Sequence, residues 1–265
     1  MKKNILVGQS GGPTAVINAS LYGIIKEAAA HSEQIGSVYG MINGIEGFLS
    51  GHIMDLSKEL SDEDLELLRL TPAAYLGSCR YKLPENLDAS VYTLLFEKFE
   101  QLNIGAVFYI GGNDSMDTAD KLSRWAAHNN KEISFIGVPK TIDNDIWGTD
   151  MTFGFQSALE IATNAIDCIH TTAASHGRVF IVEIMGHKVG SLTLNAGVAG
   201  GADVILIPEI PYDINKVVEA IQKRNKAGKR FTILAVAEGA ISKEDAELPK
   251  KKYKEKLAER AKKYP

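Results

Sequence analysis

The sequence predicts an α/β protein of two lobes, each built on a largely parallel sheet flanked by helices. Short apolar runs alternate with longer amphipathic stretches along its 265 residues, as they do in strand–helix–strand units. Glycine pairs at 11–12 and 111–112 follow two of these runs, where a strand would turn into a helix. Hydrophobic residues make up 45% and charged residues 23% of the chain, which is typical of a globular protein with a substantial core.

The first lobe is expected to span residues 1–154. Its elements are a strand at 5–7, a helix at 14–30 with Pro13 in its first turn, a strand at 105–110, a helix at 115–128 and a strand at 133–138. The unbroken apolar run at 105–110 indicates a strand that is buried on both faces.

The second lobe is expected to span residues 155–265. Its elements are helices at 157–172, 192–200 and 214–226, which alternate with strands at 179–184, 204–207 and 231–236. The tail from residue 250 is a charged segment with a thin apolar stripe. We expect a solvated helix there, in preference to a site for an anion or a partner protein.

Charge and cysteine usage restrict the environment and the partners. The net charge is −4 with the six histidines neutral, so no basic field favours nucleic acid. Cys79 and Cys168 lack metal-ligand spacing, and so few thiols indicate a reducing compartment. The apolar stretch near the N-terminus is expected to be a first strand and not a signal peptide, and no apolar run approaches the ~18 residues of a membrane span. A cytoplasmic protein is therefore expected.

Three polar turns follow predicted strands, at the sheet edge where open parallel sheets bind ligands. SGGPT at 10–14 could hold an anion on backbone N–H groups, although a tight strand-to-helix turn explains it equally well. GGNDS at 111–115 could do the same, or its aspartate could be only a helix cap.

The third turn, PKTIDND at 139–145, is harder to explain by structure alone. It places Lys140, Thr141, Asp143 and Asp145 within six residues of one another, directly after a buried strand. Two carboxylates, a hydroxyl and an ammonium can activate a nucleophile and stabilise developing phosphoryl charge. A structural turn needs only one such residue.

In this order, the three turns resemble those of the phosphofructokinase family. Further matching segments are LGSCR at 76–80, GRVFIVEIMGH at 177–187, AGGAD at 199–203 and AEG at 237–239, so the resemblance spans essentially the whole chain. It implies the phosphofructokinase fold, with two Rossmann-like lobes. Residues 1–154 would form the catalytic lobe that binds the phosphoryl donor, and residues 155–265 part of the lobe that binds the sugar phosphate.

The resemblance also implies a role for each matching residue. Asp143 would be the general base, Asp145 its supporting carboxylate, Thr141 a contact of the transferred phosphoryl group and Lys140 a cation beside it. The donor would contact Gly12, Arg80, Gly112, Asn113, Asp114 and Ser115, and Asn113 and Asp114 would hold Mg²⁺. Fructose 6-phosphate would contact Met185, Gly186, His187, Glu238 and, across a subunit interface, Arg178. A homo-oligomer, dimer or tetramer, is therefore expected.

Donor choice follows from two of these positions. In ATP-using relatives both are glycines, which leave room for the α-phosphate of the nucleotide, whereas here they are Asp114 and Lys140. The resemblance therefore favours pyrophosphate as donor, in a reversible transfer that gives fructose 1,6-bisphosphate. An ATP-dependent 6-phosphofructokinase remains the alternative. Another sugar or nucleotide kinase is disfavoured by the PKTIDND and MGH segments.

The chain departs from the family pattern in three places. Asn113 replaces an aspartate, which removes a charge from the metal site, and His187 replaces an arginine near the sugar. The family also continues past this point with a strand and a GHxQRGG-like segment. The resemblance therefore predicts a C-terminally shortened second lobe, and it leaves a catalytically incomplete or regulatory chain as a third possibility.

Overall fold

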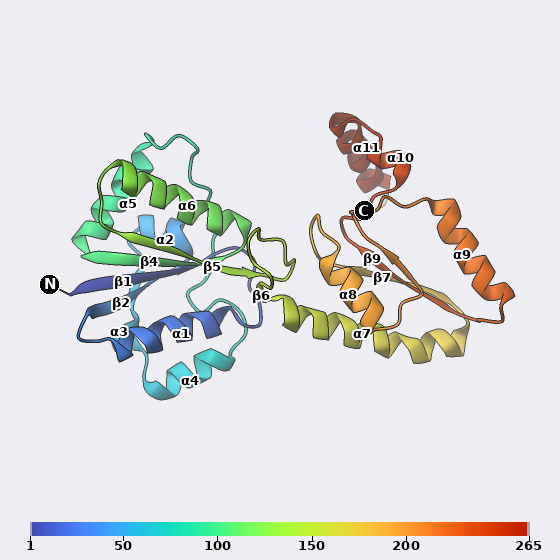
Figure 1. Cartoon of the computed structure of the whole chain (residues 1–265), viewed down its shortest axis with the longest axis horizontal. Helices are drawn as coiled ribbons and strands as arrows, with labels where there is room; N and C mark the ends of the chain where they lie inside the picture. The colour runs from blue at the N-terminus through green and yellow to red at the C-terminus, as the bar shows by residue number, and fades with distance from the viewer. Residues whose placement is uncertain (1, 264–265) are drawn as a thin grey trace. The chain divides into compact units, whose positions relative to one another are not determined.

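The computed structural model describes residues 2–263 and contains two compact units. The first unit ends at Ser157 and the second begins at Ala158, three residues after the boundary that the sequence suggested. Each unit has its own sheet (Figure 1). The α/β class predicted from the sequence is confirmed.

The first unit is built on a six-stranded sheet with the order β3-β2-β1-β4-β5-β6. All neighbouring strands are parallel except β2 and β3, which are antiparallel. The strands are β1 (Lys3–Gln9), β2 (Ile35–Met41), β3 (Ile53–Asp55), β4 (Ile104–Gly111), β5 (Ser134–Thr141) and β6 (Phe153–Gly154). Because β4 and β5 both lie on the same side of β1, the ends of these three strands are neighbours.

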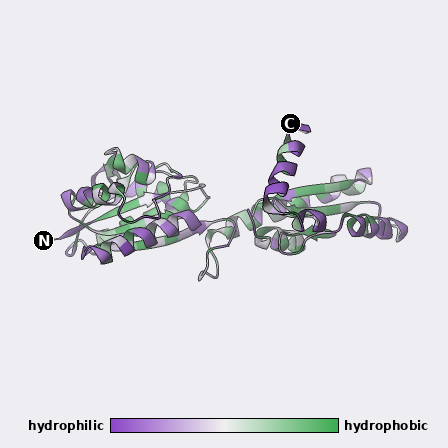
Figure 2. Ribbon diagram, turned by 90° about the horizontal axis from the view of Figure 1, so that it is seen from above, coloured by the Kyte–Doolittle hydropathy of each residue, from purple (hydrophilic) through white to green (hydrophobic). Residues whose placement is uncertain are grey.

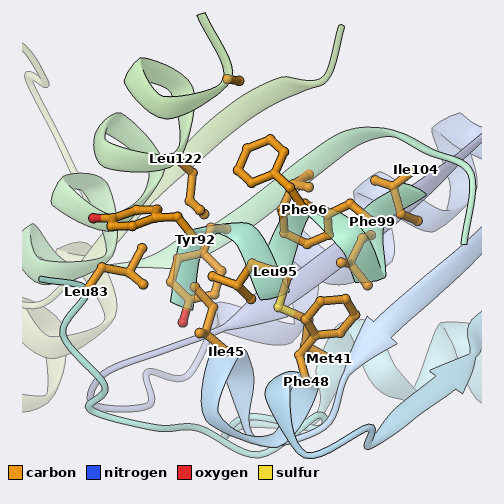
Figure 3. Packing of buried hydrophobic residues seen from close by; sticks show 14 residues of the cluster. Met41, Ile45, Phe48, Leu83, Tyr92, Leu95, Phe96, Phe99, Ile104 and Leu122 are labelled. Carbon is orange, nitrogen blue, oxygen red and sulfur yellow. The ribbon is translucent and has the colours of Figure 1, made fainter. Parts of the chain in front are cut away.

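Helices cover both faces of this sheet (Figure 1). One face packs against α2 (Gly44–Leu49), α5 (Ser90–Gln101) and α6 (Asn113–His128), and the other against α1 (Ile17–Ala30), α3 (Leu56–Glu59) and α4 (Asp62–Leu70). Figure 3 shows the first of these cores, in which Phe48, Phe96 and Phe99 pack together with Tyr92. Strand β4 is covered on both sides, which explains its unbroken apolar sequence.

The second unit contains a three-stranded parallel sheet with the order β7-β9-β8. Its strands are β7 (Val179–Ile184), β8 (Val204–Leu206) and β9 (Thr232–Ala237). Its helices are α7 (Phe155–His176), which begins in the first unit, α8 (Ser191–Ala199), α9 (Ile214–Lys226), α10 (Lys243–Ala246) and α11 (Lys250–Lys263). Strand β9 is central and almost wholly buried, whereas Ile181 on the edge strand β7 is 68% exposed.

The charged C-terminal segment is helical, as the sequence predicted, and it is attached to α10 through one carboxylate. Asp245 is buried and forms ion pairs with Lys256 and with Arg260, at 3.2 Å for the latter. Ser242 caps α10 by accepting a hydrogen bond from the amide of Asp245. A buried carboxylate needs such partners, and these fix the helix to the unit.

Some element boundaries differ from those predicted. Helix α1 begins at Ile17, after a turn at 15–16, so Pro13 lies outside its first turn. Strand β5 continues through Pro139 to Thr141, because Gly111 and then Phe153 supply further pairing partners. No element was predicted between residues 31 and 104, where the structure has β2, β3 and four helices.

The helices carry hydrophilic outer faces over hydrophobic strands (Figure 2). Within residues 2–263, none of the helices combines the length and the apolar character needed to span a lipid bilayer.

Candidate active site

The three polar turns of the first unit lie side by side at the carboxyl edge of its sheet. They follow β1, β4 and β5, which are consecutive in the strand order. The amide of Ser10 donates to the carbonyl of Ile110 at 2.9 Å, and the hydroxyl of Ser115 donates to that of Ser10 at 3.0 Å. Both serines are buried, so the first two turns are fixed to each other by an internal contact.

Close packing of these two turns requires glycine at one position. A Cβ atom on Gly111 would lie 1.9 Å from the Ser115 hydroxyl and 2.9 Å from the Ser10 carbonyl oxygen. A side chain there would therefore separate the turns. In contrast, nothing lies within 4 Å of a Cβ atom on Gly12, which leaves open space beside the backbone of the first turn.

The side chain of Lys140 reaches from β5 to the first turn. Lys140 is 2% exposed, and its ammonium donates to the carbonyl of Gly12. Burial lowers the pKa of Lys140 to about 8, although the nearby Asp143 carboxylate opposes this change. The group is therefore a buried cation whose protonation changes near neutral pH, a property that is frequent at functional sites.

The second turn ends at the N-terminus of a long helix. Helix α6 begins at Asn113, and its N-cap residue Gly112 makes no side-chain capping bond. The first N–H groups of such a helix carry partial positive charge and can bind an anion. If this turn had only a structural role, Asp114 would be expected to cap the helix, but it does not. Its carboxylate pairs with Lys82 at 2.9 Å.

The third turn brings the Asp145 carboxylate to the second turn. The hydroxyl of Thr141, at the end of β5, accepts a hydrogen bond from the amide of Asp143 at 3.2 Å. The side-chain nitrogen Nδ2 of Asn113 donates a hydrogen bond to Asp145 Oδ2 at 2.7 Å. Asp145 Oδ1 is buried, and no hydrogen-bond partner for it occurs in the part of the chain that the structure describes. An oxygen in this state is suited to a ligand.

Two residues that sequence reasoning missed hold the third turn in place. Asn144 adopts a left-handed conformation with φ of 56°, and its side-chain oxygen accepts from the amide of Thr152 at 2.9 Å. The hydroxyl of Thr152 donates to the carbonyl of Thr141 at 2.7 Å. The position of Asn144 between two aspartates could have indicated a left-handed turn, since asparagine tolerates this conformation better than most residues.

The LGSCR segment lies against the first turn. The amide of Gly11 donates to the carbonyl of Cys79 at 3.1 Å, and the Ser78 hydroxyl donates to the carbonyl of Gly11 at 2.5 Å. Arg80 follows directly and is exposed. Its guanidinium is therefore accessible to an anionic ligand.

In the second unit, the MGH and AEG segments meet at the ends of the adjacent strands β7 and β9. Glu238 Oε1 accepts from the amides of Gly186 and His187, at 3.0 and 2.5 Å. Met185 is exposed beside them. Glu209, which was not singled out in the sequence, accepts from the amide of Gly190 at 2.7 Å and so supports the other end of the same loop.

Arg178 does not belong to this group. It precedes β7, and its carbonyl accepts from Thr232 at the amino end of the sheet. Met185 lies seven positions further along the chain, which in an extended strand corresponds to about 23 Å. Arg178 and the MGH loop of one chain therefore lie at opposite edges of the sheet.

In the first unit, the carboxyl edge of the sheet offers oxygen ligands, but the described residues there form no complete metal site. Within residues 2–263, no cluster of three or more histidine, cysteine, aspartate or glutamate side chains could hold a metal ion. The unpartnered Asp145 oxygen and the neighbouring Asn113 side chain are nevertheless ligands of the kind that Mg²⁺ prefers. Mg²⁺ is commonly held by one or two such groups together with phosphate oxygens of a substrate.

Comparison with known proteins gives one consistent family. The family model described as phosphofructokinase matches residues 4–264. An ATP-dependent 6-phosphofructokinase of Spirochaeta thermophila is 40% identical over 249 residues, which cover 91% of this chain and 65% of that protein.

Two solved structures, described as pyrophosphate-dependent phosphofructokinases, are also similar. Those from Marinobacter aquaeolei and Nitrosospira multiformis have TM-scores of 0.83 and 0.84, at 39% and 36% identity. Each match covers 91% of this chain, and 61% and 62% of the respective structures. The chain thus spans somewhat less than two thirds of the length of these relatives.

Proposed function

Because this chain belongs to the phosphofructokinase family, we propose that it transfers a phosphoryl group reversibly from pyrophosphate to the 1-hydroxyl of fructose 6-phosphate. One observation carries this proposal. The ends of three adjacent strands gather a glycine turn, a helix N-terminus and the buried Lys140 around one region. Such an arrangement is suited to a polyanion.

In the proposed reaction, Asp143 accepts the proton of the sugar hydroxyl. The hydroxyl oxygen attacks the terminal phosphorus of pyrophosphate, the bond from that phosphorus to the bridging oxygen breaks, and orthophosphate leaves. Thr141, whose hydroxyl lies within hydrogen-bonding distance of the Asp143 amide, contacts the transferred group. Lys140 and the first N–H groups of α6 stabilise the charge on its oxygens.

Two side chains support pyrophosphate as the donor. Asp114 and Lys140 occupy positions where the resemblance implies glycine in ATP-using relatives. The side chain of Asp114 would obstruct an α-phosphate and the nucleotide attached to it, whereas the ammonium of Lys140 favours a short polyanion. ATP is the second candidate donor, because the similar protein of Spirochaeta thermophila is described as ATP-dependent.

Mg²⁺ would neutralise part of the donor charge and orient its oxygens. Asp145 and Asn113 are the residues best placed to hold it, because an unpartnered carboxylate oxygen lies beside an amide side chain. Asp114, which the sequence also suggested as a ligand, would have to exchange its contact with Lys82 for the ion.

Fructose 6-phosphate would bind at the MGH loop of the second unit, with Met185, Gly186, His187 and Glu238 around it. One oxygen of Glu238 holds the loop, and the other remains for a sugar hydroxyl. Since Arg178 lies at the opposite edge of its own sheet, we propose that it contacts the sugar phosphate bound to another copy. This arrangement requires a homo-oligomer.

The test is a ³¹P NMR time course with fructose 6-phosphate and Mg²⁺, run with pyrophosphate and with ATP in parallel. The proposal predicts conversion of pyrophosphate to orthophosphate and fructose 1,6-bisphosphate, and little reaction with ATP. Reaction with ATP alone would establish the second candidate. Binding of both ligands by a folded sample without turnover would instead indicate a non-catalytic chain.

A further inference from the structure

Residues 76–85 form an irregular segment that is attached to two different elements near the donor site. At one end, the backbone of Cys79 and the side chain of Ser78 bind the glycine turn, as described above. At the other end, the Lys121 ammonium donates to the carbonyl of Leu83 at 3.2 Å. We call this segment the strap. Arg80 and Lys82 lie between its two attachments.

Lys121 anchors the second end of the strap through several contacts. Its side chain is 3% exposed, and its ammonium lies 2.6 Å from Glu85 Oε1 and 2.7 Å from Asp117 Oδ2. With the Leu83 carbonyl, these oxygens satisfy all three N–H donors of the ammonium. The hydrogen bonds that Lys121 donates, first to Asp117 and then to Glu85, raise the pKa of its ammonium, so this buried group stays charged. The C-terminal end of the strap is thereby fixed to α6.

This attachment places the Lys82 ammonium 2.9 Å from Asp114 Oδ1, in the first turn of α6. Both side chains are 69% exposed, and an ion pair in such a setting contributes little to stability. The ion pair matters more for the local charge, because Lys82 compensates the negative charge of Asp114. Asp114 is a carboxylate within the proposed anion site, where it would repel any phosphate unless a cation compensates it.

We infer that Lys82 is a further specificity-determining residue, which neutralises Asp114 so that a short phosphoryl donor can bind beside that carboxylate. Asp114 then excludes a larger donor by its volume without repelling a small one by its charge. Lys82 acts through Asp114, and Lys121 positions the strap that carries it. The inference rests on the proposed function, and its test measures binding of pyrophosphate without requiring turnover.

The test is a double-mutant cycle in which pyrophosphate binding is measured by titration calorimetry with Mg²⁺. Lys82→Met should weaken binding about tenfold, because it leaves Asp114 uncompensated next to the anion. Lys82→Arg should restore affinity to near the wild-type value. In an Asp114→Asn background, Lys82→Met should have little effect, since no carboxylate remains to be neutralised.

Lys58→Met is the matched control. Lys58, an exposed lysine of α3, forms an ion pair at 2.7 Å with Asp55 of β3, whose side chain is 15% exposed. Its removal should leave pyrophosphate binding unchanged. Equal thermal midpoints of Lys82→Met and Lys58→Met would show that both variants fold.

Two results would overturn the inference while leaving the donor site intact. One is unchanged affinity in Lys82→Met, and the other is an equal loss in both backgrounds, which would mean that Lys82 contacts the donor directly. A folded wild-type chain that binds neither pyrophosphate nor ATP would overturn the proposed donor site and this inference with it.

Discussion

At the residue scale, Lys140 makes donor binding sensitive to pH. Its pKa of about 8 in the folded chain lies below the ordinary lysine value of 10.5. As the pH rises through 8, the folded protein loses this cation, and the affinity for pyrophosphate should decrease. Calorimetric titrations between pH 7 and 9.5 would measure this, and constant affinity across the range would contradict it.

The lowered pKa of Lys140 affects stability in the opposite direction: the affinity for the donor falls as the pH rises, but the stability contributed by this residue increases. Between pH 8 and 10.5 the unfolded chain binds more protons at this residue than the folded chain does. The contribution of Lys140 to the free energy of unfolding should therefore increase with pH in this window. Comparing unfolding of the wild type with Lys140→Met as a function of pH separates this contribution from that of other groups.

Gly111 permits the contact between the first two turns. Gly111→Ala should lower the free energy of unfolding by about 1–3 kcal/mol, because the new Cβ atom meets the Ser115 side chain and the Ser10 backbone. Gly23→Ala, in α1, is the control: nothing lies within 4 Å of its Cβ atom, and stability should rise slightly. Denaturant unfolding measures both, and equal effects of the two substitutions would refute the packing argument.

At the element scale, α11 depends on Asp245. Asp245→Asn should weaken the ion pairs with Lys256 and Arg260, so that limited proteolysis cleaves α11 faster while the rest of the second unit stays protected. Glu255→Gln, on the exposed part of α11, should not change the cleavage rate. Cleavage at wild-type rate in Asp245→Asn would show that other contacts hold the helix.

The elements also show what could be derived from the sequence. Strands such as β4 and β7 were predicted almost to the residue, because apolar runs bounded by glycine or polar residues are strong local signals. The region from 31 to 104 gave no comparable signal. Its strand β2 carries two glycines, and β3 is only three residues long, so tertiary pairing with β1 and β2 determines them.

In the candidate site too, some residues could be predicted from the sequence and others could not. Motif residues such as Asp143 and Asp114 were found from their sequence context, whereas their supports were not. The contacts of Lys82 with Asp114 and of Thr152 with Thr141 join segments whose proximity arises only when the strands assemble. No local pattern around Lys121 or Glu209 distinguishes them from surface residues. The importance of Lys121 follows from its burial and hydrogen bonds, and that of Glu209 from its hydrogen bond with the Gly190 amide.

At the scale of the whole molecule, the separation of Arg178 from the MGH loop predicts complementation between subunits. Arg178→Ala and Glu238→Ala chains should each be nearly inactive alone. When they are mixed and reassembled, hybrid dimers would contain one intact sugar site, and about a quarter of wild-type activity should return. Absence of any recovery would show that each chain uses its own Arg178.

The central claim is that Asp114 and Lys140 select pyrophosphate as the donor. The most direct measurement is the ratio of kcat/KM for pyrophosphate to that for ATP, in the wild type and in Asp114→Gly, with saturating fructose 6-phosphate and Mg²⁺. The account predicts a ratio well above one in the wild type and a shift toward ATP of about tenfold or more in the variant. A wild-type preference for ATP, or a ratio unchanged by the substitution, would contradict it.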